Sequence, residues 1–506
     1  MKKLLAIVIS MAMIVAMMPV GVFATGGTEE NPREVSSASE LKSAMEAGGY
    51  VQLAQDIELN EKLIINSNVT LDLNGKKIDS KYCGWTINIA TEAELTINDG
   101  AANNAGGIIC NTSTGSGSET CFILRNEGKL TVNGGTFGDS NTDKADNNTN
   151  NRGAAVINNG GNVTINGGNF TCGDNYWMIP AVTNGNKFSY AIRNYGGTMT
   201  INGGTVYGKM NGGIAADKGT ITIEDGEFYL AGTNTYYMLA TDTSQNGKIV
   251  INGGTFKRSE NDRLIGAFTG MPSWSAIDNL AANGYTINGG EFYINDRNIG
   301  PVAKISDRYF STFAAAIAAA NENDTVKLIK DIKEDITVPA GKSITIDLNS
   351  KSITNSSSDT ITVAQGANLT IKGTGTVDNI THRKAALVNY GTAVLDGGTY
   401  TRSLENKENN KDSAGKNSFY TILNDKGGNM TIKNGVNVTN KGHFSSMIRN
   451  GGDSASQSTS KLKINGGSFS GGLNTVKNDE LGELTVSGGS FSNTSQFVIM
   501  NWHKAN

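Results

Sequence analysis

The sequence contains little proline, cysteine or histidine for its length. Its 506 residues include 6 prolines, 4 cysteines and 3 histidines, against 63 glycines. So much glycine with so little proline argues against collagen and proline-rich linkers and favours many tight turns. The cysteines form no CxxC pair of the kind that holds a metal ion. At 38% hydrophobic residues, the chain can nevertheless bury a large core.

An excess of positive charge is also absent, and so is any long apolar run beyond the N-terminus. The net charge of -4 gives no reason to expect nucleic acid as a partner. Lys2 and Lys3 precede an apolar run over residues 4–22, and Ala24 suits a signal peptidase. This pattern is typical of a secretory signal peptide over residues 1–24. An uncleaved membrane anchor is the alternative. We therefore expect an exported protein with no membrane span after signal cleavage.

The four cysteines leave their pairing open. They are Cys83, Cys110, Cys121 and Cys172, all in the first part of the chain. Export permits disulfides, and Cys110 and Cys121 are the nearest pair in sequence. Small hydrophobic side chains buried in a core are the equal alternative.

One short phrase recurs from one end of the chain to the other. It reads Leu-Thr-Val-Asn-Gly-Gly-Thr-Phe at residues 130–137, and it returns at 163–170 and 199–206. Spacings of roughly 22 to 37 residues within each half are typical of a solenoid, whose stacked repeats share one core. Further copies surround Ile223, Ile251, Ile287, Ile371, Leu395, Ile432, Ile464 and Val486.

Each repeat is predicted to form three short strands. In the phrase, Leu130 and Val132 point inward and Thr131 points outward. Asn-Gly-Gly makes a turn in which glycine accepts positive φ, and Phe137 then points inward from the next strand. A second phrase, an aliphatic residue two positions before an asparagine, supplies the third strand. Its copies end at Asn126, Asn158, Asn194, Asn389, Asn424, Asn450 and Asn478. We expect parallel sheets with strands about 4.8 Å apart and asparagines hydrogen-bonded along the stack as a ladder.

Two similar sets of N-terminal elements divide the chain. Residues 25–34 are expected to be a flexible lead-in. A solenoid needs a distinct cap over its first coil. We predict two tandem stacks, 35–300 and 301–506, with the boundary near 298–303. The cap elements are a helix over 37–47 with strands over 50–53, 63–65 and 69–78, and a helix over 310–320 with strands over 325–332 and 344–353.

Polar inserts and an open end complete the predicted organisation. Inserts over 138–152, 171–187 and 402–417 are expected to be loops on one side of the stacks. Residues 497–501 form one more aliphatic-x-Asn phrase, with no closing helix after it. Because an open stack exposes strand edges, we expect a fragment of a longer protein or a docking site for another chain.

These phrases resemble the right-handed parallel β-helix of the pectate-lyase-like superfamily. More narrowly, they are similar to adhesin-like exported surface proteins of Gram-positive anaerobes. The resemblance covers residues 35–501 and implies an all-β, right-handed parallel β-helix solenoid. It implies little about activity, because the fold hosts lyases, hydrolases, tailspikes and adhesins. A β-propeller is the structural alternative, but its blades need about 40 residues and these units are shorter.

The catalytic groups that the superfamily implies are not recognisable here. Its lyases use acidic calcium ligands from adjacent coils with an Arg or Lys base, but the outward column here is mainly threonine: Thr131, Thr164, Thr200, Thr222, Val250, Thr286 and Thr370. Glu224-Asp225 interrupts it, and we favour a solvated turn over a cation site. Its glycosidases carry Asn-Thr-Asp, Asp-Asp and Gly-His-Gly motifs. Residues 141–143 match the first by letters only, no Asp-Asp occurs, and Gly442-His443 lacks the last glycine.

No catalytic residue, metal or cofactor is therefore predicted, and calcium is an option that no motif supports. The histidines, His382, His443 and His503, are scattered and are expected at the surface.

Candidate ligand-binding residues come from two patterns. The outward residue of the aliphatic-x-Asn phrase is basic in several coils, and Arg449 and Lys477 are expected on successive coils. Such a row suits an anionic glycan, although solvated spacers that discourage aggregation are the alternative. Aromatic residues in or near the inserts can stack on sugar rings or clamp the inserts. The two sets are Arg125, Arg193, Arg449 and Lys477, and Tyr176, Trp177 and Trp274.

We therefore expect a secreted, cell-surface β-helix protein that acts in adhesion or in glycan or protein binding through its sheet faces and inserts. The expected partner is an extracellular glycan or a surface protein of a host or neighbouring cell. The alternatives are a polysaccharide lyase or glycoside hydrolase of the same superfamily, and a structural spacer in a larger surface protein. Clustered carboxylates on adjacent coils would favour an enzyme, whereas a charge-poor threonine face would favour binding.

Overall fold

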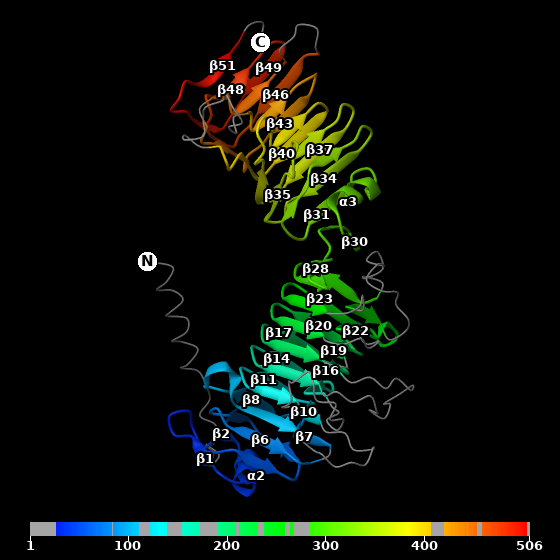
Figure 1. Cartoon of the computed structure of the whole chain (residues 1–506), viewed down its shortest axis with the longest axis vertical. Coiled ribbons are helices and arrows are strands. Elements are labelled where there is room, and N and C mark those ends of the chain that lie inside the picture. Colours follow the sequence, from blue (N-terminus) through cyan, green and yellow to red (C-terminus); the bar gives the residue numbers. More distant parts are fainter. Residues whose placement is uncertain are drawn as a thin grey trace. The chain divides into compact units, whose positions relative to one another are not determined.

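The structure is a computed structural model in which the chain forms two compact units. The first ends at Asn298 and the second begins at Ile299, apart from a few residues before Asn298 that group with the second. Figure 1 shows the strands of each unit following one another in sequence order. The residues described are 27–82, 84–110, 122–138, 154–172, 190–208, 212–230, 237–258, 264–267, 283–405, 419–442, 444–452 and 458–502.

Three sheets make up the first unit, and the chain visits them in turn. Successive strands pass from sheet A to sheet B to sheet C and back, so that one coil adds one strand to each sheet. Sheet A contains β1 (Arg33–Val35), β2 (Gly49–Leu53), β5 (Val69–Asp72), β8 (Glu94–Asn98), β11 (Lys129–Val132), β14 (Asn162–Ile165), β17 (Thr198–Ile201), β20 (Gly219–Ile223), β23 (Gly247–Ile251) and β26 (Tyr285–Ile287).

Sheet B contains β3 (Ile57–Leu59), β6 (Lys77–Ser80), β9 (Gly107–Cys110), β12 (Thr136–Gly138), β15 (Asn169–Cys172), β18 (Thr205–Gly208), β21 (Glu227–Leu230), β24 (Thr255–Arg258), β27 (Glu291–Ile294) and the antiparallel β28 (Arg297–Asn298). Sheet C contains β4 (Leu63–Ile65), β7 (Trp85–Ile89), β10 (Phe122–Asn126), β13 (Val156–Asn158), β16 (Tyr190–Asn194), β19 (Gly212–Ala216), β22 (Leu239–Thr241) and β25 (Ile265–Ala267). Short 3-10 helices, η2 (Ala102–Asn104) and η3 (Thr243–Gln245), lie in connections.

The second unit repeats this plan with sheets D, E and F. Sheet D contains β30 (Arg308–Phe310), β29 (Ala303–Ile305), β31 (Thr325–Leu328), β34 (Ser343–Asp347), β37 (Asn368–Lys372), β40 (Thr392–Asp396), β43 (Asn429–Ile432), β46 (Ser460–Ile464) and β49 (Gly482–Val486). Sheet E contains β32 (Ile332–Lys333), β35 (Lys351–Thr354), β38 (Gly375–Asp378), β41 (Thr399–Thr401), β44 (Asn437–Asn440), β47 (Ser468–Gly471) and β50 (Ser490–Ser492). Sheet F contains β33 (Ile336–Val338), β36 (Ile361–Val363), β39 (Leu387–Asn389), β42 (Ile422–Asn424), β45 (Ile448–Asn450), β48 (Asn474–Asn478) and β51 (Phe497–Asn501). The long parallel sheets define an all-β protein that is consistent with a parallel β-solenoid.

A short helix lies near the start of each unit. In α2 (Ala38–Ala47), the Ser37 side chain accepts a hydrogen bond from the backbone N–H of Glu40, which satisfies one of the donors at the helix start. Thr312 caps α3 (Phe313–Ala319) in the same way. The second helix begins later than the predicted residue 310, because β30 pairs antiparallel with β29 first and the Thr312 cap fixes the helix start.

The predicted strand over 69–78 is wrong, because it is two strands separated by a tight turn. Asn74 and Gly75 have φ of 48° and 73°. The Asp72 carboxylate accepts a hydrogen bond from the Asn74 backbone N–H at 2.9 Å, which favours the turn. The segment 344–353 divides in the same way, with Asp347 bonded to the Asn349 N–H at 3.0 Å.

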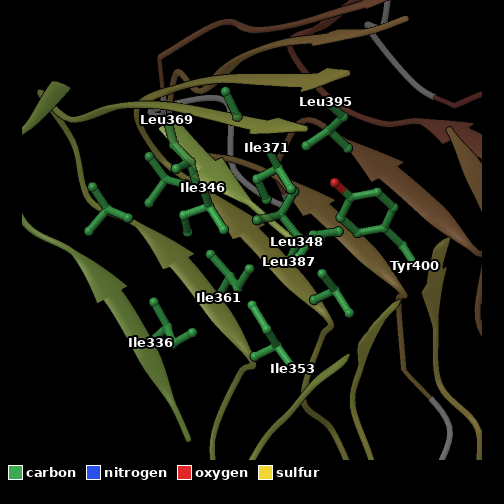
Figure 2. Packing of buried hydrophobic residues seen from close by; sticks show 14 of the residues in the cluster. Ile336, Ile346, Leu348, Ile353, Ile361, Leu369, Ile371, Leu387, Leu395 and Tyr400 are labelled. Atoms are coloured by element: carbon green, nitrogen blue, oxygen red, sulfur yellow. The ribbon is translucent and has the colours of Figure 1, made fainter. Parts of the chain in front are cut away.

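Alternation along the strands builds the core of each unit. Leu130 lies beside Leu95 and Val163 in neighbouring coils, and all three are buried. Figure 2 shows the equivalent packing in the second unit, where Ile346, Leu369 and other aliphatic residues from three sheets meet. The predicted inward aromatics are confirmed as stacks with ring centroids 4.6 to 5.1 Å apart: Phe137–Phe170, Phe228–Phe256, Phe256–Phe292 and Phe469–Phe491.

The predicted asparagine ladder is confirmed in both units. In the first unit, the Asn126 side-chain amide donates to Asn158 at 2.9 Å, and Asn158 donates to Asn194 at 2.8 Å. All three side chains are buried. In the second unit the same bonds join Asn389, Asn424, Asn450, Asn478 and Asn501, at 2.7 to 3.2 Å. The ladder fixes the coil register, because a buried amide without partners would be costly.

Candidate functional site

The outer face of sheet A carries a column of threonines. Thr96, Thr131, Thr164, Thr200 and Thr222 are register partners on successive strands. Each lies between buried inward residues, so the backbone beneath the column is held by the core. Val250 interrupts the column in the next coil. The face is therefore regular and carries few charges.

A second, solvent-exposed ladder runs beside this column. Asn133 donates to Asn98, Asn166 to Asn133 and Asn202 to Asn166, each at 2.8 Å. Other polar side chains of sheet A are also paired: Lys129 contacts Glu94 at 2.6 Å, and Thr198 donates to Asn162 at 2.6 Å. Much of the hydrogen-bonding capacity of this face is thus used within the protein.

Sheet D carries the same threonine column with a different border. Thr345 lies beside Thr370, and Val394 and Thr431 follow in the next coils. The column that corresponds to the exposed asparagines alternates in charge. It consists of Lys327, Asp347, Lys372, Asp396 and Lys433.

A shallow depression of about 120 Å³ lies on the outer face of sheet D. It crosses β34, β37 and β40, the strands whose inward residues appear in Figure 2 as Ile346, Leu369 and Leu395. The lining is made of Asn323, Ser343, Ile344, Thr345, Asn368, Leu369, Thr370, Thr392 and Val394. Because hydroxyl and amide groups both donate and accept hydrogen bonds, this lining can bind a polar ligand. It contains no side chain that could act as an acid or base at neutral pH.

Arg449 and Lys477 lie on successive coils as predicted, but the carboxylate of Asp479 pairs with both. The two residues are register partners on β45 and β48. Asp479, which is buried, lies 2.9 Å from Arg449 Nε and 2.7 Å from Lys477 Nζ. Arg449 is itself buried beneath the ring of Tyr420. This pairing offsets positive charge that the sequence pattern assigned to an anionic ligand.

Arg193 is held even more closely. Its guanidinium makes two 2.7 Å hydrogen bonds to the Asp217 carboxylate and lies over the Tyr195 ring. Burial alone lowers the pKa of Arg193, but the hydrogen bond and the charge of Asp217 raise it overall. Burial also raises the pKa of the Tyr195 hydroxyl to about 12. The Arg193 guanidinium therefore stays charged and bound to Asp217.

Of the remaining candidates, Arg125 belongs to a surface ion pair and the aromatic residues lie outside the described part of the chain. Arg125 contacts Glu127 at 2.6 Å and lies near the Trp85 ring, which stacks on Phe122. Tyr176, Trp177 and Trp274 lie outside the described residues, as do most of the predicted inserts. A ligand-binding role for any of these residues stays a prediction.

The acidic pair Glu224–Asp225 makes hydrogen bonds to nearby groups. Glu224 accepts a hydrogen bond from the Asn252 amide at 2.9 Å, and Asp225 accepts one from the Gly226 N–H at 2.8 Å. Within the described ranges, no three His, Cys, Asp or Glu side chains are grouped so that they could hold a metal ion.

The Asn-Thr-Asp match and two of the histidines lie outside the described residues. Residues 141–143, His443 and His503 belong to the part that is not described. Cys110 is buried at the end of β9, and Cys83 and Cys121 are not described, so the cysteine pairing stays open.

Sequence reasoning missed an aromatic row on the outer face of sheet B. Tyr207 and Tyr229 stack with centroids 5.3 Å apart, and Lys257 follows beside Tyr229 in the next coil. Lys257 in turn lies 5.9 Å from the ring of Tyr293. The signal was present in the sequence, because each residue stands one position after an inward aromatic or aliphatic residue and so faces outward. Since the rings of Tyr207 and Tyr229 stack on each other, the face that each presents to its neighbour is not open to a sugar.

No protein-family model matches this chain, and neither does any curated protein or any solved structure. Among the described residues, no helix has both the length and the apolar character needed to span a membrane.

Proposed function

We propose that this is an exported, cell-surface protein with a right-handed parallel β-helix in each unit. Its role is adhesion, by binding an extracellular glycan or a surface protein of another cell through the outer sheet faces. The observation that carries this proposal is the charge-poor threonine column with its hydroxyl- and amide-lined depression on sheet D. Such a surface supplies regular hydrogen-bonding groups and no acid–base pair.

The ion pairs support binding rather than lyase chemistry. A lyase of the resembled superfamily needs a cluster of calcium ligands and a basic residue that can take a proton. The described part of the chain offers no such cluster, and Arg193 and Arg449 are tied to buried carboxylates. These arginines serve to hold neighbouring coils together.

The test uses the purified chain from Thr25 onward and a panel of acidic and neutral polysaccharides. Retention of the protein on each polymer and ultraviolet absorbance from unsaturated products are both recorded, with and without calcium. We expect retention without product. Calcium-dependent product would contradict the proposal in favour of a lyase, and an absence of both signals would favour a spacer.

A further inference from the structure

The depression on sheet D contains polar side chains that the described part of the protein leaves without hydrogen-bond partners. We propose that it is a subsite for a neutral polysaccharide, an uncharged chain of hydroxyl-bearing sugars. This inference rests on the proposed binding function and names its ligand class. It also assigns the ligand to the second unit and to a face different from that of the Arg449–Lys477 row.

The register of three strands arranges the binding groups in two parallel columns. Ser343, Asn368 and Thr392 form one column. Thr345 and Thr370 lie in the other, two residues further along their strands. Because neighbouring strands are about 4.8 Å apart, equivalent groups recur at a constant interval along the depression. A polymer with repeating hydroxyls presents the same kind of periodic pattern.

These groups are both available and held in place. In the described chain, the side chains of Ser343, Thr345, Asn368, Thr370 and Thr392 make no hydrogen bond to other protein groups, and all are at least partly exposed. Threonine is β-branched, so its side chain has few alternative rotamers to lose on binding. The strands beneath are fixed by buried residues. Binding therefore requires little ordering of the protein.

Sheet A provides the contrast within the same molecule. It has the same threonine column, but its neighbouring asparagines donate to one another along the exposed ladder. Lys129 and Glu94 form an ion pair there. The sequence phrase alone thus does not make a binding site. The column of Ser343, Asn368 and Thr392, whose side chains make no hydrogen bond in the described chain, distinguishes sheet D.

The charges around the depression give an anionic polymer no advantage over a neutral one. The lining of the depression contains no titratable side chain. Along its border, Asp347 lies beside Lys327 and Lys372, and Asp396 contacts Lys433 at 3.0 Å. An anionic chain running along the sheet would meet lysine and aspartate in alternation, so that attraction and repulsion offset each other. A neutral chain that binds through hydroxyl and amide groups needs no cation.

The test compares two double variants of the chain from Thr25 onward. Thr345→Val with Thr370→Val removes two hydroxyls from the depression and keeps the β-branched shape. Thr131→Val with Thr164→Val is the matched control on sheet A. Affinity electrophoresis measures retention by neutral polymers (hydroxyethyl cellulose, arabinoxylan, yeast mannan, laminarin) and acidic ones (polygalacturonate, hyaluronate). Circular dichroism and thermal unfolding check that both variants fold.

We expect a neutral polymer to be retained, and the sheet D variant to weaken that retention about tenfold, since two neutral hydrogen bonds are lost. The control should bind as the wild type does. Retention of acidic polymers only, or equal loss in both variants, would overturn this inference and leave the proposed function standing. Failure of every polymer in the panel to retain the wild type would overturn both.

Discussion

Asparagine side chains inside a protein need partners for both ends of the amide. In the second unit, Asn450 accepts from Asn424 and donates to Asn478, each at 2.7 Å, and also donates to the Glu483 carbonyl at 3.1 Å. One residue thus joins three successive coils. Because only an amide of this length both donates and accepts at that turn, the ladder defines which residues of neighbouring coils align.

Asn450→Ala should lower the free energy of unfolding by about 2–3 kcal/mol, because it removes both the bond from Asn424 and the bond to Asn478 from a buried site. Urea unfolding followed by circular dichroism measures the change. The control is Asn465→Ala, an exposed asparagine that accepts a hydrogen bond from Ser487 at 3.0 Å, and it should cost well under about 1 kcal/mol. Equal costs would mean that the buried ladder contributes no special stability.

The buried ion pairs make a similar prediction about arginine. Arg449→Ala should lower the free energy of unfolding by about 3 kcal/mol, because Asp479 stays buried with one cation fewer. Lys477→Ala should cost under about 1 kcal/mol, since Lys477 is more exposed and solvent can replace it.

Urea unfolding separates the two variants. Retention on polygalacturonate, measured on folded protein at low temperature, gives the second readout. A large and equal loss of retention in both variants, with unchanged stability, would restore the anionic-ligand role that the sequence suggested.

At the scale of single elements, strand alternation was predictable and pairing between coils was not. Leu130 and Val132 point inward and Thr131 points outward, as the sequence indicates. This is predictable because successive side chains of a strand lie on opposite faces of the sheet. The turn at Asn74 was missed because its apolar–polar alternation also fits one continuous strand. The local pattern cannot distinguish one strand from two strands joined by a turn when the turn residues continue the same apolar–polar alternation.

The acidic partners of the arginines were missed for a different reason. Asp217 is 24 residues from Arg193, and Asp479 is 30 residues from Arg449. Each directly follows the strand that pairs with the arginine's own strand in the next coil. A signal is visible once the ladder is known: Glu127 and Asp479 each follow a ladder asparagine directly, at Asn126 and Asn478. The depression on sheet D depends on which side chains stay unpaired, and no sequence phrase encodes that.

The segment after β41 gives a pH prediction. Arg402 Nε lies 2.7 Å from the Glu405 carboxylate, which also accepts from the Phe419 N–H at 3.3 Å. Burial raises the pKa of Glu405, although Arg402 opposes this. A carboxyl whose folded-state pKa is raised binds its proton more readily in the folded protein. Its contribution to stability therefore improves as pH falls from neutral toward that pKa.

Glu405→Gln removes this titration. We expect the stability of the wild type relative to Glu405→Gln to rise between pH 7.5 and pH 5, measured from urea midpoints at each pH. A relative stability that falls over this range would show that the Arg402 ion pair dominates burial and lowers the pKa instead. The variant Glu334→Gln, whose carboxylate accepts from the N-terminal N–H groups of α3, serves as a control outside this segment.

At the scale of the whole molecule, stability in a stack of coils comes from neighbours. Every inner coil of the second unit has a coil on both sides, and its inward residues are buried. The coil of β49, β50 and β51 is covered on one side in the described chain. Phe497 is 54% exposed and Trp502 is 51% exposed. Among the described residues, Phe491 stacks on Phe469 alone.

Hydrogen exchange should therefore be graded along the second unit. Backbone amides of β51 should exchange much faster than those of β45 and β42, because opening the last coil exposes little buried surface whereas opening an inner coil disrupts two interfaces. Exchange measured by mass spectrometry at several protein concentrations tests this. Uniform protection at all concentrations would show that a further segment covers the last coil. Protection that grows with concentration would show that a second chain does, since strand edges and exposed aromatic residues at one end are the surfaces through which such stacks associate.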